Sequence, residues 1–286
     1  MANRSAVKFL SLLGLSTVLL ANGAFAAPWD PTSQAANTSL TQSRHNLTQS
    51  FSSQETLMDF FRNNYGEVCV YCHTPHGANV TTTNAPLWNH TINTASYTTW
   101  NTIAGTSWYP GPGSLICLGC HDGSVAIDSV INMPGSGAYK ESNKDGTGDM
   151  TFLDNAWTGV GGGHLPLGNC IGCHTGGFGP DFRAFDLGKD LRNDHPVGVN
   201  YPATGTANFN IPANEKAGKV KFFGGDSTLN KEDIRLVYSG SSYKVECVSC
   251  HDPHGVPSAG TGSVFVGSFL RKDNAASALC LTCHDK

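Results

Sequence analysis

The chain has 286 residues, of which 14% are charged, 33 are glycine, 14 are proline, 10 are cysteine and 11 are histidine. The low charge excludes a charged disordered tail, and the glycine and proline content stays below the roughly 25–30% that is typical of low-complexity disorder. The formal net charge is −4, and the chain contains no block of Lys or Arg. We therefore exclude nucleic acid as a partner.

Residues 1–26 have the pattern of a secretory signal peptide. Arg4 and Lys8 come first, an apolar run follows, and residues 24–26 read Ala-Phe-Ala, which is typical of a signal-peptidase site. The apolar run is shorter than the roughly 20 residues that cross a bilayer. We predict a secreted chain with one domain over residues 27–286 and no membrane span.

The predicted helices are few and short. Ser52 and Glu55 form a capping box for a helix that ends before the first cysteine pair. Asn230 is placed to cap a helix over residues 231–238, and Asn274 to cap a turn that leads into residues 280–284.

Extended structure is predicted only for residues 220–223 and 264–266. Gly, Asn, Thr, Ser and Pro dominate the stretches 76–114, 134–168 and 199–218, which we predict to be loops. The prediction from these elements is a mostly irregular coil with short α-helices and minimal β-structure.

All ten cysteines fall into five copies of the pattern C-x-x-C-H. The thiol pairs are Cys69 and Cys72, Cys117 and Cys120, Cys170 and Cys173, Cys247 and Cys250, and Cys280 and Cys283. This pattern is the attachment site of a c-type haem. One helical turn places two thiols where they can bond the two vinyl groups on one edge of a porphyrin, and the next histidine then lies under the iron as its proximal ligand. The sequence predicts five covalently bound haem c groups.

Three other interpretations explain less. A disulfide framework places no constraint on the residue after each pair, yet all five pairs are followed by histidine. Zinc sites combine two C-x-x-C units and would leave one of five unused. A redox dithiol of the thioredoxin kind would be a single copy beside a βαβ pattern.

The eleven histidines divide into two groups. The five that complete the motifs are predicted proximal iron ligands: His73, His121, His174, His251 and His284. The remaining six are predicted candidates for the distal positions: His45, His76, His90, His164, His195 and His254. An iron with histidine on both faces has no vacant site, so it transfers electrons and does not bind substrate.

The six distal candidates differ in their surroundings. His76 and His254 each lie three residues after a proximal histidine, and the intervening proline turns the second imidazole away from its own haem and towards a neighbour. His164 and His195 lie in loops, and His45 precedes the first motif. His90 is the one we would omit if one histidine is surplus.

A weak duplication links the first and fourth motifs. The segments Cys69 to Gly77 and Cys247 to Gly255 differ only inside C-x-x-C and at Thr74 against Asp252. The predicted mature chain is too short to enclose each haem in its own domain, so the haems must share one core, and we expect the apoprotein to be unfolded.

These segments resemble the doubled CXXCH motif multihaem cytochromes c, and within them the OmcS/OmcE-like outer-surface filament cytochromes of metal-respiring bacteria. The residues that carry the resemblance are Ser43 to Leu47, Glu67 to Gly77, Ala85 to Asn89, Cys117 to Gly123, His195 to Gly198, Cys247 to Gly255 and Leu279 to His284.

The resemblance implies a fold organised around a stacked chain of haems with histidine on both faces of each iron. In filament formers, one haem receives its distal histidine from the next subunit, and His45 is the residue of this chain that best suits this role. It implies a homopolymer, with redox cytochromes or extracellular metal oxides as partners, although five haems depart from the numbers familiar in those filaments.

Three functions compete at this point. The first is an extracellular electron conduit at the cell surface, and the second is a monomeric periplasmic carrier that donates to a terminal reductase. The third is a multihaem enzyme such as a nitrite reductase. An enzyme of that kind needs an iron with an open distal face, commonly in a C-x-x-C-K site, and the chain contains no C-x-x-C-K. We therefore predict an electron-transfer protein with no catalytic residue.

Overall fold

The computed structural model describes most of the chain after residue 64. The described residues are 40, 43, 45–47, 65, 67–81, 85–92, 96–100, 105, 108–132, 167–172, 174–175, 181–203, 208–257 and 266–285. The predicted signal peptide, the helix that follows Ser52, and the residues His164 and Cys173 lie outside these ranges.

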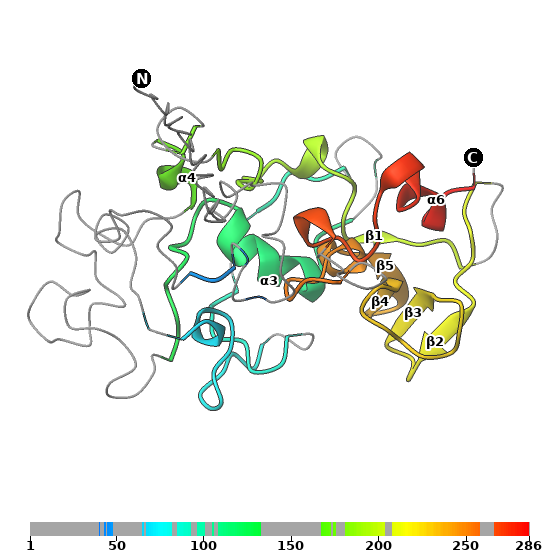
Figure 1. The fold of residues 1–286 in the computed structure, drawn as a ribbon, viewed down its shortest axis with the longest axis horizontal. Helices are drawn as coiled ribbons and strands as arrows, with labels where there is room; N and C mark the ends of the chain where they lie inside the picture. The colour runs from blue at the N-terminus through cyan, green and yellow to red at the C-terminus, as the bar shows by residue number, and fades with distance from the viewer. Residues whose placement is uncertain are drawn as a thin grey trace, which may run out of the picture.

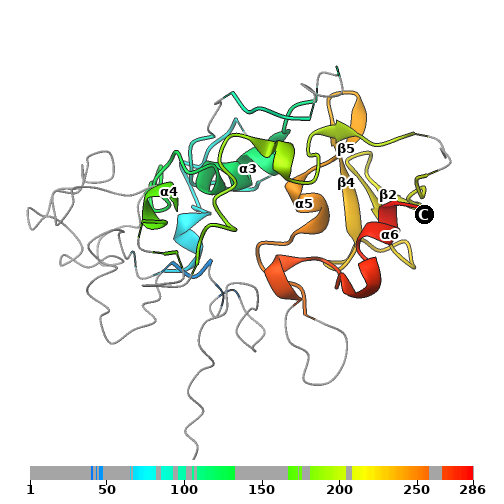
Figure 2. The ribbon, with the colours of Figure 1, turned by 90° about the horizontal axis from the view of Figure 1, so that it is seen from above.

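A five-stranded antiparallel sheet forms one end of the molecule (Figures 1 and 2). The strands follow the spatial order β1-β5-β4-β3-β2. Their bounds are β1 (Val199–Asn200), β2 (Asn214–Lys216), β3 (Val220–Phe223), β4 (Ile234–Ser239) and β5 (Ser242–Val245). The prediction of a coil with minimal β-structure, organised only around a stacked haem chain, was therefore wrong: the fold contains a sheet with its own backbone hydrogen bonds and packed side chains.

Strand β4 replaces the helix predicted over residues 231–238. Ile234 and Leu236 are both at most 2% exposed and point to one face, while Tyr238 points outward and pairs across the strands with Tyr243. Alternation with a period of two is the pattern of a half-buried strand. Asn230 does not cap a helix, because its side-chain amide donates to the Thr228 carbonyl at 3.2 Å and its N–H donates to the Asp233 carboxylate at 2.7 Å, which closes a turn before β4.

The other predicted elements had mixed outcomes. The strand over residues 220–223 is confirmed as β3. The predicted loop 199–218 contains β1 and β2, which are short enough to lack a recognisable alternation. The predicted loop 76–114 ends at helix α3 (Pro112–His121), where proline occupies the first turn, because its missing N–H costs nothing there. Of the predicted strand 264–266, only Val266 is described, and its N–H donates to Val256.

The helical elements are single turns apart from α3. They are η2 (Cys69–Tyr71), α4 (Leu167–Cys170), η5 (Leu191–Asn193), α5 (Cys247–Cys250), η6 (Gly267–Phe269), η7 (Ala275–Ser277) and α6 (Cys280–Cys283). Both ribbon views show α4, α3, α5 and α6 in that order along the longest axis (Figures 1 and 2). At the predicted cap, the Asn274 side chain accepts from the Leu279 N–H at 3.2 Å and so supports the turn before α6.

The hydrophobic core of the described residues consists of three small clusters. The first is built on Tyr65 and Tyr71, the second on Tyr97 and Leu118, and the third on Leu236 and its neighbours in the sheet. Cys72 packs against the first cluster, Leu118 belongs to the second motif, and Cys283 packs against the third. Three of the cysteine motifs are thus anchored on separate pieces of core.

Candidate functional site

Each C-x-x-C-H segment forms a turn of helix. In four of them the backbone N–H of the histidine donates to the carbonyl of the first cysteine, at 2.8 Å for His73, 2.9 Å for His174, 3.0 Å for His251 and 2.9 Å for His284. The remaining segment forms the last turns of α3. In the four motifs whose cysteines are both described, this turn brings two thiols and one imidazole together, which is the arrangement that haem attachment requires.

The thiols of different motifs lie close to one another. The nine described cysteines are free thiols. The thiols of Cys117 and Cys247 form a hydrogen bond, which together with burial raises the pKa of Cys117. Burial and the neighbouring Cys72 raise the pKa of Cys120 to about 12. The second motif therefore lies beside both the first and the fourth.

The fourth motif also lies beside the fifth. Burial and the neighbouring Cys283 raise the pKa of Cys250 to about 12. Burial raises the pKa of Cys283 to about 11, although a hydrogen bond with Tyr201 acts to lower it. The thiols of the first, second, fourth and fifth motifs are thus electrostatic neighbours in that order.

Three of the predicted proximal imidazoles are held by a hydrogen bond at Nδ1. Nδ1 lies 2.8 Å from the Pro86 carbonyl in His73, 2.7 Å from the Phe185 carbonyl in His121, and 2.9 Å from the Ser268 carbonyl in His251. A carbonyl can only accept, so Nδ1 carries the proton and Nε2 keeps a free lone pair. This is the usual support of a metal-binding histidine, whose second nitrogen is fixed by a hydrogen bond.

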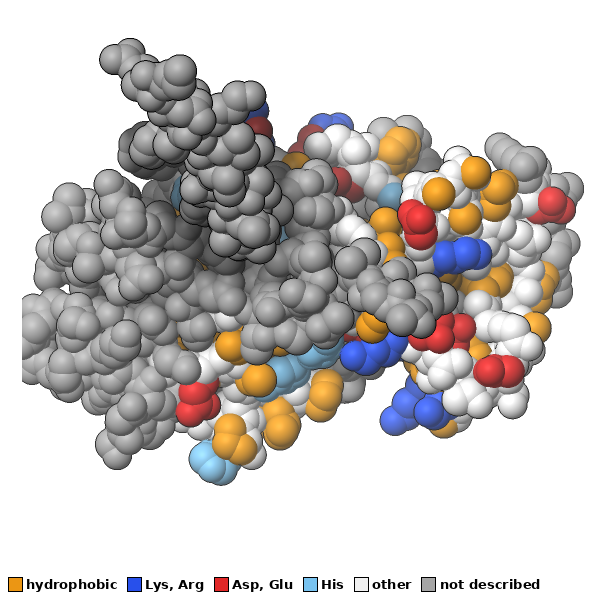
Figure 3. Space-filling view, viewed as in Figure 1, with side chains coloured by type: hydrophobic (Ala, Val, Ile, Leu, Met, Phe, Trp, Pro, Cys, Tyr) orange, Lys and Arg blue, Asp and Glu red, His pale blue; other side chains and the backbone are white. Residues whose placement is uncertain are grey.

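Three of the predicted distal histidines face a proximal histidine. Ring centroids are 6.1 Å apart for His254 and His73, 6.2 Å for His45 and His121, and 6.5 Å for His195 and His284. These three contacts join residues that lie far apart in the sequence. In the space-filling view, histidine side chains lie among hydrophobic ones on the lower part of the visible face (Figure 3).

His45 lies within its own chain's group of imidazoles. Its Nδ1 is 3.1 Å from the Pro253 carbonyl, and its ring stacks on Phe269 at 4.3 Å. Burial and the neighbouring His121 lower its pKa to about 4, which keeps the imidazole neutral and able to bind a metal. The resemblance had implied a role for His45 in a neighbouring subunit, and here its ring faces His121 of the same chain.

The other predicted distal residues have different surroundings. His90 is 1% exposed and packs against Trp88 at 5.7 Å. Burial lowers its pKa, and the Tyr71 backbone and the Asp128 carboxylate oppose that effect. His76 is exposed, whereas His164 lies outside the described residues. The proximal His174 stacks on Phe182 at 4.0 Å.

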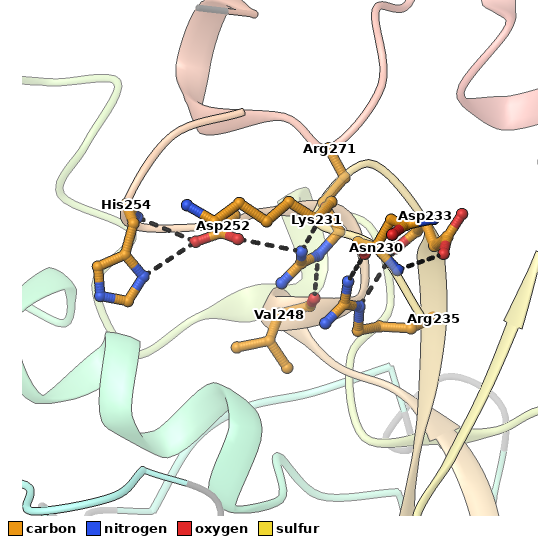
Figure 4. Close-up of polar contacts among 8 residues, drawn as sticks. All are labelled: Asn230, Lys231, Asp233, Arg235, Val248, Asp252, His254 and Arg271. Carbon is orange, nitrogen blue, oxygen red and sulfur yellow. Dashed lines mark hydrogen bonds and ion pairs between the residues drawn. The ribbon is translucent and has the colours of Figure 1, made fainter. Parts of the chain in front are cut away.

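Two buried acidic residues escaped the sequence analysis. Asp252 accepts from the backbone N–H of His254 at 3.0 Å, lies 3.1 Å from Nδ1 of the same residue, and meets Arg271 at 3.2 Å (Figure 4). Burial raises the pKa of Asp252, but the His254 hydrogen bonds and the Arg271 charge outweigh it and lower the pKa to about 2. The signal was present in the duplication, where Asp252 replaces Thr74.

Glu246 is the second such residue. It is 2% exposed and precedes the fourth motif. Its carboxylate accepts from the Gly111 N–H at 3.1 Å and from the Ser114 hydroxyl, so it joins the sheet side of the molecule to the start of α3. Ser114 in turn accepts from the Cys247 N–H at 2.9 Å. Glu246 therefore fixes the second motif relative to the fourth.

The residues present fit a c-type haem. Free thiols adjoin an imidazole whose Nε2 is available, and in three cases a second imidazole faces the first. The described residues contain no group of three or more His, Cys, Asp or Glu side chains that could hold a metal ion by themselves. A haem iron requires only two protein ligands, since the porphyrin supplies the other four.

The comparisons with known proteins agree with this reading. Residues 242–286, which include the fourth and fifth motifs, match the family described as "Doubled CXXCH motif". A search of curated proteins finds no match. The family match supports a multihaem c-type cytochrome with covalently bound haem and suggests that it transfers electrons. Among the described helices, none is both long and apolar enough to cross a membrane.

Proposed function

We propose that this chain is a secreted cytochrome with five haem c groups that conducts electrons as an extracellular conduit at the cell surface. The observation that carries the proposal is the closeness of thiols in different motifs, above all Cys117 and Cys247, which lie on the contacting helices α3 and α5. Porphyrins bonded at such thiols would have their edges close together. Because electron tunnelling slows exponentially with distance between edges, this spacing suits rapid transfer between haems.

The order of the motifs supports a linear route. The thiols of motifs one, two, four and five are neighbours in that order, and α4, α3, α5 and α6 follow one another along the longest axis (Figure 2). The fourth motif lies between the second and the fifth. Its haem is therefore the step through which electrons must pass between the two ends.

Removing single haems tests this route. Mass spectrometry of the intact secreted protein counts the haems, and five are expected. Replacing both Cys247 and Cys250 with serine removes the fourth haem and should leave the fifth reduced long after the others when ferric oxide particles oxidise the protein. The matched variant replaces both Cys280 and Cys283, removes an end haem, and should leave oxidation of the remaining four fast. Equal kinetics in the two variants would contradict a linear route.

A monomeric periplasmic carrier is the second proposed function. The position of His45 beside His121 of its own chain supports it, because a polymer would then need a different donor of the distal histidine. The homopolymer and the metal-oxide or cytochrome partners remain predictions. Electron microscopy of material sheared from the cell surface separates the two functions, since a polymer gives an axial repeat and the carrier is recovered as a monomer in the periplasmic fraction.

A further inference from the structure

The spacing between His254 and His73 is that of two ligands on one metal ion. An imidazole nitrogen binds a first-row metal at about 2.0 Å, and the ring centroid lies about 1.2 Å behind it, so two opposed imidazoles hold their centroids about 6.4 Å apart. The observed separation is 6.1 Å, and the ring planes differ by only 8°. Both Nδ1 atoms are engaged, with Pro86 and Asp252, so the Nε2 atoms are the ones left to bind a metal.

A chain of buried groups holds His254 in this orientation. One oxygen of Asp252 receives the backbone N–H of His254 and contacts its Nδ1, and the other oxygen meets Arg271. Arg271 is 5% exposed and also donates to the carbonyls of Val248 at 2.9 Å and Lys231 at 2.6 Å (Figure 4). If the carboxylate rotated away, the buried guanidinium would keep its two carbonyl acceptors but would lose the negative charge that it faces.

The first motif lacks this device. At the position equivalent to Asp252 it has Thr74, whose hydroxyl donates to the backbone carbonyl of His76 at 2.8 Å rather than to a ring nitrogen. The two halves of the duplication thus treat their second histidine differently. Both rings are exposed, but only the His254 ring is held by a buried carboxylate.

We propose that His254 is the distal ligand of the haem attached at Cys69 and Cys72, and that Asp252 is a positioning residue that sets its tautomer and basicity. The proposal rests on the proposed haem-binding function and adds the pairing. A carboxylate that accepts from Nδ1–H makes the imidazole a stronger donor, which stabilises the ferric state. This haem should therefore have a lower potential than it would with a neutral partner at position 252.

Removal of the ligand tests the pairing. His254→Ala should lose about one fifth of the ferric low-spin signal, since one of five haems is affected, and added imidazole should restore it. Ferric haems with parallel imidazole planes give a rhombic paramagnetic resonance spectrum, whereas crossed planes give a single large-g feature. His45 and His195 cross their facing rings at 69° and 63°, so those two pairs should not give a rhombic signal, and the intensity that is lost should be rhombic.

Combining His254→Ala with the loss of the first attachment site shows which haem is affected. In the variant with serine at both positions 69 and 72, the haem in question is absent, and His254→Ala should change nothing further in the low-spin spectrum. A further loss there, or an unchanged spectrum in the single variant, would overturn the pairing. If mass spectrometry finds no covalent haem, the proposed function itself fails, so the two failures are distinguishable.

The role of Asp252 requires a readout other than stability. Asp252→Asn keeps the volume and should keep the low-spin state, but it should raise the potential of one haem in a spectroelectrochemical titration. The control Asp273→Asn removes the same charge from an exposed carboxylate of the same segment and should leave all potentials in place. Equal shifts in both variants, or none with Asp252→Asn, would overturn the positioning role.

Discussion

Replacing Glu246 with alanine should weaken the link between the sheet and α3 and so destabilise the protein. The change leaves the Gly111 N–H and the Ser114 hydroxyl, both buried, without their acceptor. A buried donor that loses its partner costs about 1–3 kcal/mol, so the free energy of unfolding should fall by about 4 kcal/mol. At roughly 2–4 °C per kcal/mol for a chain of this size, the melting temperature should fall by roughly 10 °C.

Two further variants make the result specific. Glu246→Gln keeps the volume and one acceptor oxygen and should cost about 1 kcal/mol. Glu215→Ala removes an exposed carboxylate that lies 3.9 Å from Lys221, and it should cost at most about 1 kcal/mol. The assay is thermal unfolding of the haem-loaded protein, followed by circular dichroism. If Glu246→Ala and Glu215→Ala have the same melting temperature, the link between the sheet and α3 contributes little to stability and the reasoning fails.

The pH dependence gives an independent check. Burial raises the pKa of Glu246 above its ordinary value of 4.5, and the hydrogen bonds from Ser114 and Gly111 only partly oppose it. A carboxyl group whose pKa is raised on folding contributes stability that is fully present below the unfolded pKa and is lost as the pH rises through the folded value. The stability of the wild type relative to Glu246→Gln should therefore fall as the pH rises above 4.5.

Two other substitutions have matched controls. Gly198→Ala should lower the free energy of unfolding by more than about 2 kcal/mol, because φ is +74° and a Cβ would lie 2.1 Å from the Tyr109 carbonyl. In the control Gly188→Ala, φ is +64° and nothing lies within 4 Å of the added Cβ, so the loss should be about 1 kcal/mol. Equal melting temperatures of the two variants would refute the argument. Arg271→Met should cost about 3–5 kcal/mol because a buried carboxylate loses its partner, whereas Arg192→Met removes an exposed pair and should shift the chemical-denaturation midpoint little.

Local chemistry was predictable from the sequence, and long-range pairing was not. The helical turns from Cys247 and Cys280 follow from the motif alone, because the pattern of thiols and histidine spans a single turn. The strand β3 followed from its β-branched and aromatic residues. The sequence could not predict that His254 faces His73. This contact depends on how the sheet and α3 are joined, and Glu246 makes that join.

The error at β4 has a specific cause. Asn230 reads as a helix cap, but its side chain bonds back to the Thr228 carbonyl, and its N–H and the Asp233 carboxylate close a turn. The residues after it then pair with β3 and β5, and that pairing becomes favourable only once those strands have been brought together. Propensity within the segment carries no information about such neighbours.

The contact between Cys117 and Cys247 also constrains how the protein can be assembled. Before haem is attached, two thiols that already form a hydrogen bond are well placed to lose two electrons to an oxidant and become cross-linked. In an oxidising compartment such a cross-link would block two attachment sites at once. Maturation therefore depends on timing, and these thiols must be kept reduced, or held apart by an incompletely folded chain, until their porphyrins have arrived.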